Sequence, residues 1–163
     1  MTTLPIITNR KVIHAAGVLI IQPDAELGES WRAALVDFGM TGAHVVADGE
    51  AAIASIRTRR PSGIVIALES QIDAHDLMVR FAHGECGDLA DIPVVLVMPR
   101  PTRSAVIAAA SAGFDAVLPF PLAPRLIYRR MGSLMQKARR AARLKAQSHQ
   151  SLASVLEGES GLG

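Results

Sequence analysis

Cysteine, aromatic residues and long apolar runs are scarce in this sequence, and each scarcity excludes a class of protein. Cys86 is the only cysteine of the chain, so an intrachain disulfide and a multi-cysteine zinc or iron-sulfur site are excluded. Aromatic residues make up 4% of the chain, which argues against a stacking surface for single-stranded nucleic acid. No apolar run reaches the roughly 18–20 residues that span a bilayer, and the first residues lack the order of a signal peptide. We therefore expect a cytoplasmic protein in a reducing environment.

Charge is distributed unevenly along the chain. The net charge is +2, but residues 1–121 carry nine Lys/Arg against thirteen Asp/Glu, whereas residues 122–163 carry eight against two. The 50% share of hydrophobic residues in a chain of 163 is enough for one aliphatic core, and it excludes global disorder. The sequence therefore predicts one domain with an acidic body and a basic C-terminal segment.

Short aliphatic runs alternate with longer segments of helical period, as in βα units wound into a parallel sheet. The runs that predict strands are residues 18–21, 43–46, 64–68, 93–97 and 116–118. The segments that predict helices are residues 27–38, 50–60, 74–82, 103–112 and a long stretch that begins at Pro124. We expect a leader over residues 1–16, a doubly wound α/β domain over 17–134, and an extended basic helix with a linker stub over 135–163.

Several local motifs occur in the order and spacing of one known family. They are VLII at 18–21, ADGEA at 47–51, Pro61, IPV at 92–94, AGFDA at 112–116 and FPL at 120–122. With these motifs the sequence resembles the receiver domain of response regulators over about residues 17–134. The resemblance implies a flavodoxin-like fold with a five-stranded parallel sheet in the order 2-1-3-4-5.

The resemblance also implies where phosphorylation takes place, at the loops that follow the carboxyl ends of the strands. Working receivers have an acid pair for Mg²⁺ after strand one, a phosphoacceptor aspartate after strand three, a Ser/Thr after strand four and a lysine after strand five. The matching positions here are Gln22 and Pro23, Ala67, Met98 and Phe120. These side chains supply neither the metal ligands, nor the nucleophile, nor the cation that phosphoryl transfer needs. We predict a degenerate pseudo-receiver that is not an enzyme, has no metal or cofactor, and carries an apolar plug at these positions.

Two other groups of residues are candidate cation sites. Asp24, Glu69 and Asp73 lie near the same loops and form a candidate displaced acidic site, although Asp24 and Asp73 also suit helix N-caps. The second group consists of His75, His83, Cys86 and Asp88. These residues have the atom types of a zinc site, although their spacing fits no structural zinc finger. Exposed loop residues are the interpretation that we favour for both groups.

The C-terminal helix has an imperfect heptad pattern, with polar Lys145 and Ser148 in the seam. We expect its first turns to pack on the sheet and the remainder to project beyond the body. The basic residues of this helix include Arg129, Arg130, Lys137, Arg139, Arg140 and Arg143. The favoured interpretation is the solvated face of a helix that pairs with a second copy, and the alternative is attraction to RNA or DNA, or to a membrane surface.

In receivers, the fourth helix, the fifth strand and the fifth helix form the usual partner surface. The residues that we place on it are Val106, Phe114, Tyr128, Met131 and Leu134. Together these observations predict a phosphorylation-independent signalling module that acts through protein contacts, as a homodimer and through an output domain or partner. The alternative function is an antiterminator-type RNA-binding regulator that uses the basic helix.

Overall fold

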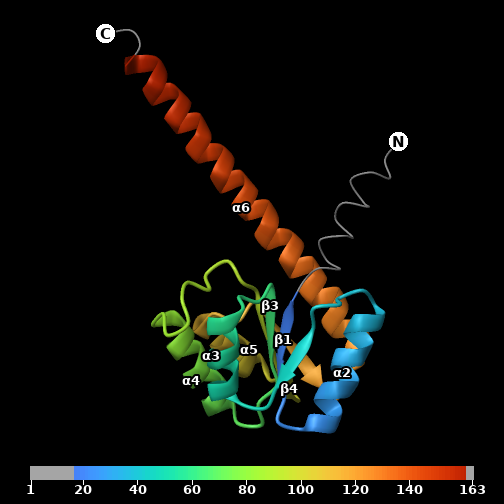
Figure 1. Ribbon diagram of the computed structural model, residues 1–163. Coiled ribbons are helices and arrows are strands. Elements are labelled where there is room, and N and C mark those ends of the chain that lie inside the picture. The colour runs from blue at the N-terminus through green and yellow to red at the C-terminus, as the bar shows by residue number, and fades with distance from the viewer. Residues whose placement is uncertain (1–16, 161–163) are drawn as a thin grey trace.

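The computed structural model describes residues 17–160 and contains one five-stranded parallel sheet (Figure 1). Its strands lie in the order β2-β1-β3-β4-β5. Their bounds are Val18–Ile21 for β1, His44–Val46 for β2, Gly63–Ile66 for β3, Val94–Pro99 for β4 and Ala116–Phe120 for β5. The predicted fold class and strand order are confirmed. The predicted leader, residues 1–16, lies outside the described residues.

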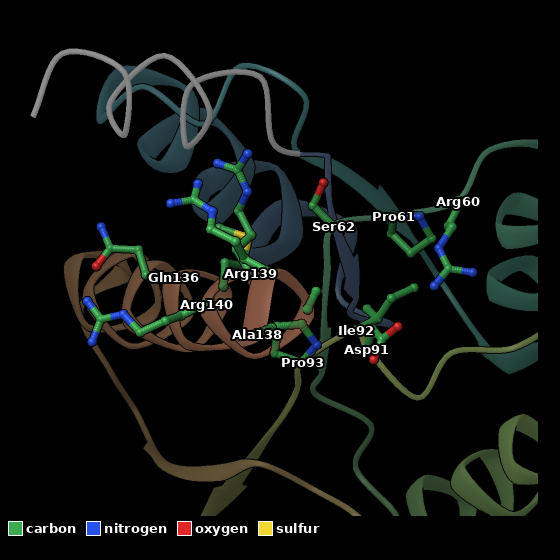
Figure 2. Close-up of a pocket in the computed structure, with 13 residues that line it drawn as sticks. Arg60, Pro61, Ser62, Asp91, Ile92, Pro93, Gln136, Ala138, Arg139 and Arg140 are labelled. Carbon is green, nitrogen blue, oxygen red and sulfur yellow. The ribbon is translucent and has the colours of Figure 1, made fainter. Parts of the chain in front are cut away.

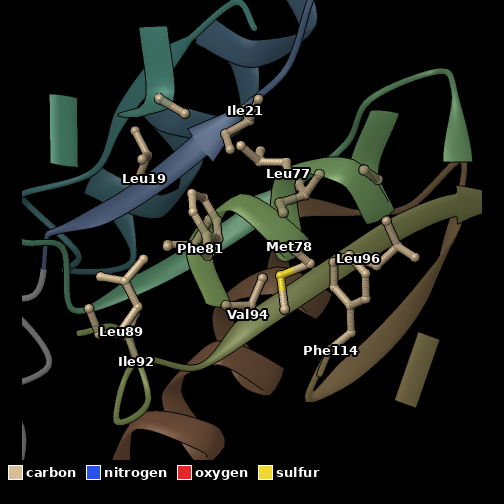
Figure 3. Close-up of a cluster of buried hydrophobic side chains, with 14 of the residues drawn as sticks. Leu19, Ile21, Leu77, Met78, Phe81, Leu89, Ile92, Val94, Leu96 and Phe114 are labelled. Atoms are coloured by element: carbon tan, nitrogen blue, oxygen red, sulfur yellow. The ribbon is translucent and has the colours of Figure 1, made fainter. Parts of the chain in front are cut away.

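Helices cover both faces of the sheet, and two hydrophobic clusters fill the layers between them. The helices are α2 (Ala25–Asp37), α3 (Gly49–Thr58), α4 (Gln71–Ala82), α5 (Arg103–Ala112) and α6 (Pro124–Ser160). One cluster joins α3, α4 and α5 to the sheet and includes Leu77, Phe81 and Leu96 (Figure 3). The other joins α2 and α6 to the opposite face and includes Trp31 and Ile127. All four β1 residues are fully buried, as expected for a strand that is covered on both faces.

Local sequence signals fix the starts and ends of the helices. Asp24, Asp48 and Thr102 act as N-caps, because each side chain accepts a hydrogen bond from a backbone N–H of the first turn. At α4 the cap is Ser70, and Asp73 lies in the first turn, so the suggested capping role of Asp73 is wrong. Gly113 ends α5 with φ of 102°, a left-handed conformation that glycine adopts without steric cost.

Helix α6 runs from the body into solvent, as the sequence predicts (Figure 1). Ile127, Met131 and Met135 of its first turns are buried against the sheet, whereas residues 139–158 are exposed. The helix crosses very close to the start of β3: a Cβ added to Gly63 would lie 2.5 Å from Sδ of Met131. Glycine at this position therefore permits the close approach of α6 to the sheet. The helix continues to Ser160.

The structure corrects part of the predicted partner surface. Phe114 and Met131 are buried in the two core clusters and are not exposed to a partner. Tyr128 is half-buried and its ring packs against Phe38 of α2, with centroids 5.3 Å apart, because this side of α6 faces α2. Leu134 is also half-buried against the core.

Helix α5 exposes apolar side chains to solvent. Val106, which the sequence places on the partner surface, is 41% exposed, Ile107 is 57% exposed, and Ala110 is exposed too. Ala109 is the one buried residue of this helix. The apolar surface of α5 therefore lies in solvent, beside the exposed end of β5.

Candidate functional site

The positions that correspond to a receiver phosphorylation site gather at the carboxyl edge of the sheet. Ile21 of β1 pairs with Ile66 of β3, and the next residue, Ala67, donates its backbone N–H to the Ile21 oxygen at 2.9 Å. On the far side, Met98 of β4 pairs with Pro119 of β5, directly before Phe120. The register therefore brings the ends of β1, β3, β4 and β5 together, as the sequence predicts.

At the end of β1, the side chain of Gln22 is closed off from solvent. Gln22 is 7% exposed, and its Oε1 accepts a hydrogen bond from the backbone N–H of Asp24 at 3.0 Å. The backbone of α2 covers it, because a Cβ added to Gly28 would lie 3.4 Å from both Cβ and Cγ of Gln22. Pro23 is exposed and has no side-chain oxygen. A buried neutral amide therefore stands where the resemblance places a metal-binding carboxylate.

The ends of β3 and β5 carry apolar side chains on the α2 and α6 face of the sheet. Ala67 is half-buried against the cluster that contains Trp31. Phe120 is 38% exposed, and its ring lies 6.5 Å from the Trp31 ring, centroid to centroid, in a tilted arrangement. The Phe120–Pro121 peptide bond is cis. The position that the resemblance gives to a phosphate-binding lysine thus makes an aromatic contact.

Met98 does not join these side chains. It is 3% exposed and belongs to the cluster on the other face of the sheet, with Leu96 and Phe114. Successive residues of a strand point to opposite faces, and the register of β4 directs Met98 away from Ala67. The predicted single apolar plug is therefore divided between the two layers of the core.

The acidic side chains near this edge do not assemble into a cation site. Oδ1 of Asp24 accepts a hydrogen bond from the Leu27 N–H at 3.0 Å, and Oδ1 of Asp48 accepts one from the Ala51 N–H at 2.8 Å. Glu69 and Asp73 are exposed. Within residues 17–160, no three His, Cys, Asp or Glu side chains lie close enough to hold a metal ion. Neither of the two candidate cation groups of the sequence therefore comes together as a metal site in the described residues.

The four residues of the suggested zinc group have separate contacts. His75 packs edge-on against Phe114, with ring centroids 5.6 Å apart, and Asp88 accepts a hydrogen bond from the Ala90 N–H at 2.9 Å. Cys86 is half-buried against the core, and burial is the main cause of the raised pKa of its thiol. His83 is the C-cap residue of α4.

Arginines hold the segment between α4 and β4 in place. Arg57 donates its Nε–H to the Glu85 backbone oxygen at 3.0 Å, and Arg60 donates from Nη1 to the Asp88 oxygen at 2.6 Å. Arg80 forms ion pairs with Glu50 and Glu85, both at 2.5 Å, and this contact lowers the pKa of Glu85. Arg57 and Arg60 thus join the end of α3 to a segment that lies 28 residues further along the chain.

A second concave site lies at the amino edge of the sheet, where the strands begin, and sequence reasoning missed it. It is a cavity of about 530 Å³ between the α3–β3 turn, the residues before β4, and α6. Figure 2 shows Arg60 on one side of Ser62 and Arg139 on the other. Three segments that are far apart in the sequence form this cavity, so no local motif could have revealed it.

Solved structures of receiver domains share this fold. A signal receiver domain from Vibrio parahaemolyticus matches with a TM-score of 0.68 and 14% identity, covering 79% of this chain and 96% of that chain. Chemotaxis response regulator CheY4 of Vibrio cholerae matches with a TM-score of 0.65 and 15% identity, covering 73% and 98%. The receiver domain of a histidine kinase from Syntrophus aciditrophicus matches with a TM-score of 0.62 and 21% identity, covering 76% of this chain and 92% of that chain.

No protein-family model and no curated protein sequence matches the chain. The structural matches nevertheless agree with one another, because two of them are receiver domains and the third is a response regulator. The chain therefore has the fold of response-regulator receiver domains. Among residues 17–160, no helix is both long enough and apolar enough to cross a membrane.

Proposed function

We propose that this chain is a pseudo-receiver, a signalling module of the two-component type that works without phosphorylation. The observation that carries this proposal is the chemistry of the carboxyl edge. Gln22 places a buried amide at the position of a metal ligand, Ala67 places a methyl group at that of the phosphoacceptor, and Phe120 places an aromatic ring at that of the lysine. Phosphoryl transfer needs a nucleophile, a metal ion and a cation at such an edge, and these side chains supply none of them.

Signalling then depends on protein contacts, and two exposed apolar surfaces support a homodimer. The first is formed by α5 and its neighbours, where Val106, Ile107, Phe120 and Leu126 are exposed. Exposed apolar patches of this kind commonly mark interaction sites. In receiver domains the corresponding face is the usual partner surface, which favours the same use here.

The second surface is the projecting part of α6. Leu152 and Val155 are 61% and 59% exposed and occupy successive seam positions of the heptad pattern. A long helix with an apolar seam is stabilised when the seam packs against a partner helix. We infer that two copies pair their α6 helices and that this pair transmits the signal to an output domain or partner protein.

The dimer is tested by static light scattering on the full chain. We expect a dimer for the native protein and a monomer for the double variant Leu152→Glu/Val155→Glu, because carboxylates in the seam repel each other. The matched control is Gln147→Glu/Ser154→Glu, which adds the same charge at outer heptad positions and should remain a dimer. A monomeric native protein contradicts the dimer, and a Leu152→Glu/Val155→Glu variant that remains a dimer, or equal dissociation in both variants, contradicts pairing through the α6 seam.

The alternative function, binding of RNA through α6, is favoured by the basic residues of the helix. Lys137, Arg139, Arg140 and Arg143 form no ion pair within the described part of the chain. Retention of the native protein on single-stranded RNA, with a steep decrease in affinity as salt increases, is the expected signature. Retention that does not change with salt, or its absence, excludes this alternative.

A further inference from the structure

The cavity at the amino edge combines positive charge with a shaped apolar floor. Its floor is formed by buried Pro61, Ile92, Pro93 and Met135. Its rim carries four arginines, Arg60, Arg139, Arg140 and Arg143, against a single carboxylate from Asp91. A volume of about 530 Å³ lies within the range of small-molecule sites, roughly 300–1,000 Å³.

Within the described residues, none of the four rim arginines forms an ion pair with a carboxylate. Arg60 is fixed in place, because its Nη1 donates to the Asp88 backbone oxygen at 2.6 Å. Each guanidinium has five N–H donors, so Arg60 retains donors for a ligand after this contact. The rim is therefore a set of available donors that surrounds a concave surface.

The geometry points to a binding site for a polyphosphate nucleotide in this cavity. Guanidinium groups match the planar, bidentate geometry of phosphate oxygens, and four of them exceed what a single monoanion can use. The apolar floor offers a packing surface for a base, and the Asp91 carboxylate is an acceptor for an amino or hydroxyl donor of the ligand. This proposal does not depend on the pseudo-receiver function, because the cavity lies at the opposite edge of the sheet.

A small molecule fits these observations better than a nucleic-acid strand. The charge is concentrated around a hollow between α6 and the body, with Arg60 on one side of Ser62 and Arg139 on the other (Figure 2). A strand that follows α6 would use all of its basic residues equally, including Arg129 and Arg130, which do not line the cavity. A ligand held between Arg60 and Arg139 would attach the middle of α6 to the body and stiffen the start of the projecting segment.

Isothermal titration calorimetry on the full chain tests the proposal, with ATP, inorganic triphosphate and adenosine as probes in magnesium-free buffer. We expect saturable binding of ATP, weaker binding of triphosphate and no binding of adenosine. The variant Arg139→Glu/Arg143→Glu should weaken ATP binding at least about tenfold, because two charge-assisted contacts become repulsive. The matched control Arg129→Glu/Arg130→Glu makes the same charge change outside the cavity and should weaken it by less than about threefold.

Amide chemical shifts identify the location of the bound ATP. Shifts centred on Ser62 and Ile92 in the native protein, and their loss in the Arg139/Arg143 variant, support the proposal. The absence of ATP binding, equal weakening in the two charge variants, or shifts centred on Ala67 overturns it. Displacement of ATP by single-stranded RNA also overturns it if the Arg129/Arg130 variant and the Arg139/Arg143 variant weaken the displacement equally, because this result indicates attraction to the whole helix.

Discussion

The side-chain oxygen of Gln22 accepts a hydrogen bond from the backbone N–H of Asp24, at 3.0 Å. The carboxylate of Asp24 is turned the other way, where it accepts from the Leu27 N–H and caps α2. A neutral amide thus organises the turn after β1, and the nearby carboxylate is engaged with the helix. This pair of contacts stabilises the turn after β1.

Gln22→Glu should therefore destabilise the protein at neutral pH. The new carboxyl group is nearly isosteric but is buried, so desolvation raises its pKa in the folded state above the unfolded value of about 4.3. We expect a loss of about 1–3 kcal/mol at pH 7 and a smaller loss at pH 4, where the group is mostly protonated in both states. Urea unfolding at the two pH values measures this difference. The exposed control Pro23→Glu should change stability by no more than about 1 kcal/mol at either pH.

The contact between Phe120 and Trp31 supports the end of β5. Phe120→Ala should lower the free energy of unfolding by about 1–2 kcal/mol, less than a fully buried phenylalanine because the ring is 38% exposed. Trp31 is the only tryptophan of the chain, so its fluorescence reports this site directly. The emission spectrum of the folded state should change in Phe120→Ala and remain unchanged in Phe38→Leu, which affects the Tyr128 contact. Identical spectra for the native protein and Phe120→Ala would show that the two rings do not interact.

The close contact between Gly63 and Met131 sets the distance between α6 and the sheet. Gly63→Ala should destabilise the protein by about 1–3 kcal/mol, because the new methyl group meets a methionine that is fully buried and has little room to move. In a protein that already carries Met131→Ala, Gly63→Ala should lower the free energy of unfolding by less. A double-mutant cycle measures this coupling. Gly132→Ala is the control: nothing lies within 4 Å of its added Cβ, so helix propensity should raise stability by about 0.5–1 kcal/mol. Additive effects of Gly63→Ala and Met131→Ala would contradict the close contact.

The ion pairs of Arg80 make part of the stability dependent on pH. Hydrogen bonding to Arg80 is the main cause that lowers the pKa of Glu85 below its usual 4.5. The contribution of this carboxylate is therefore present above pH 4.5 and is lost as the pH falls through the lower pKa of the folded state. Glu85→Gln should show a smaller decrease in stability on acidification than the native protein, and added salt should reduce the difference. Parallel pH profiles for the two proteins would contradict this role.

The elements that end at a capping side chain, a glycine or a proline could be predicted from the sequence. The bounds of α5 follow from the capping side chain of Thr102 and from Gly113, and those of β1 follow from an aliphatic run that ends before Pro23. The end of β5 was missed, because Pro119 indicates a break in a central strand. β5 is an edge strand, where a proline is tolerated, and it continues to Phe120.

The candidate site could be predicted only in part. The five degenerate positions follow from the resemblance, and the structure brings their strand ends together. The opposite orientations of Ala67 and Met98 depend on the register between strands, which the sequence does not specify. The burial of Phe114 and Met131 was missed for a similar reason, because periodicity identifies an apolar face but not whether another element covers it.

The proposal that this chain does not respond to phosphorylation is tested most directly by amide spectra of the labelled full chain during titration with beryllofluoride and Mg²⁺. Beryllofluoride mimics a phosphoryl group and requires the aspartate and the metal site that Ala67 and Gln22 replace. The account predicts no saturable chemical-shift change at the carboxyl edge of the sheet. Saturable shifts centred on Ala67 and on the turn after β1 would contradict it.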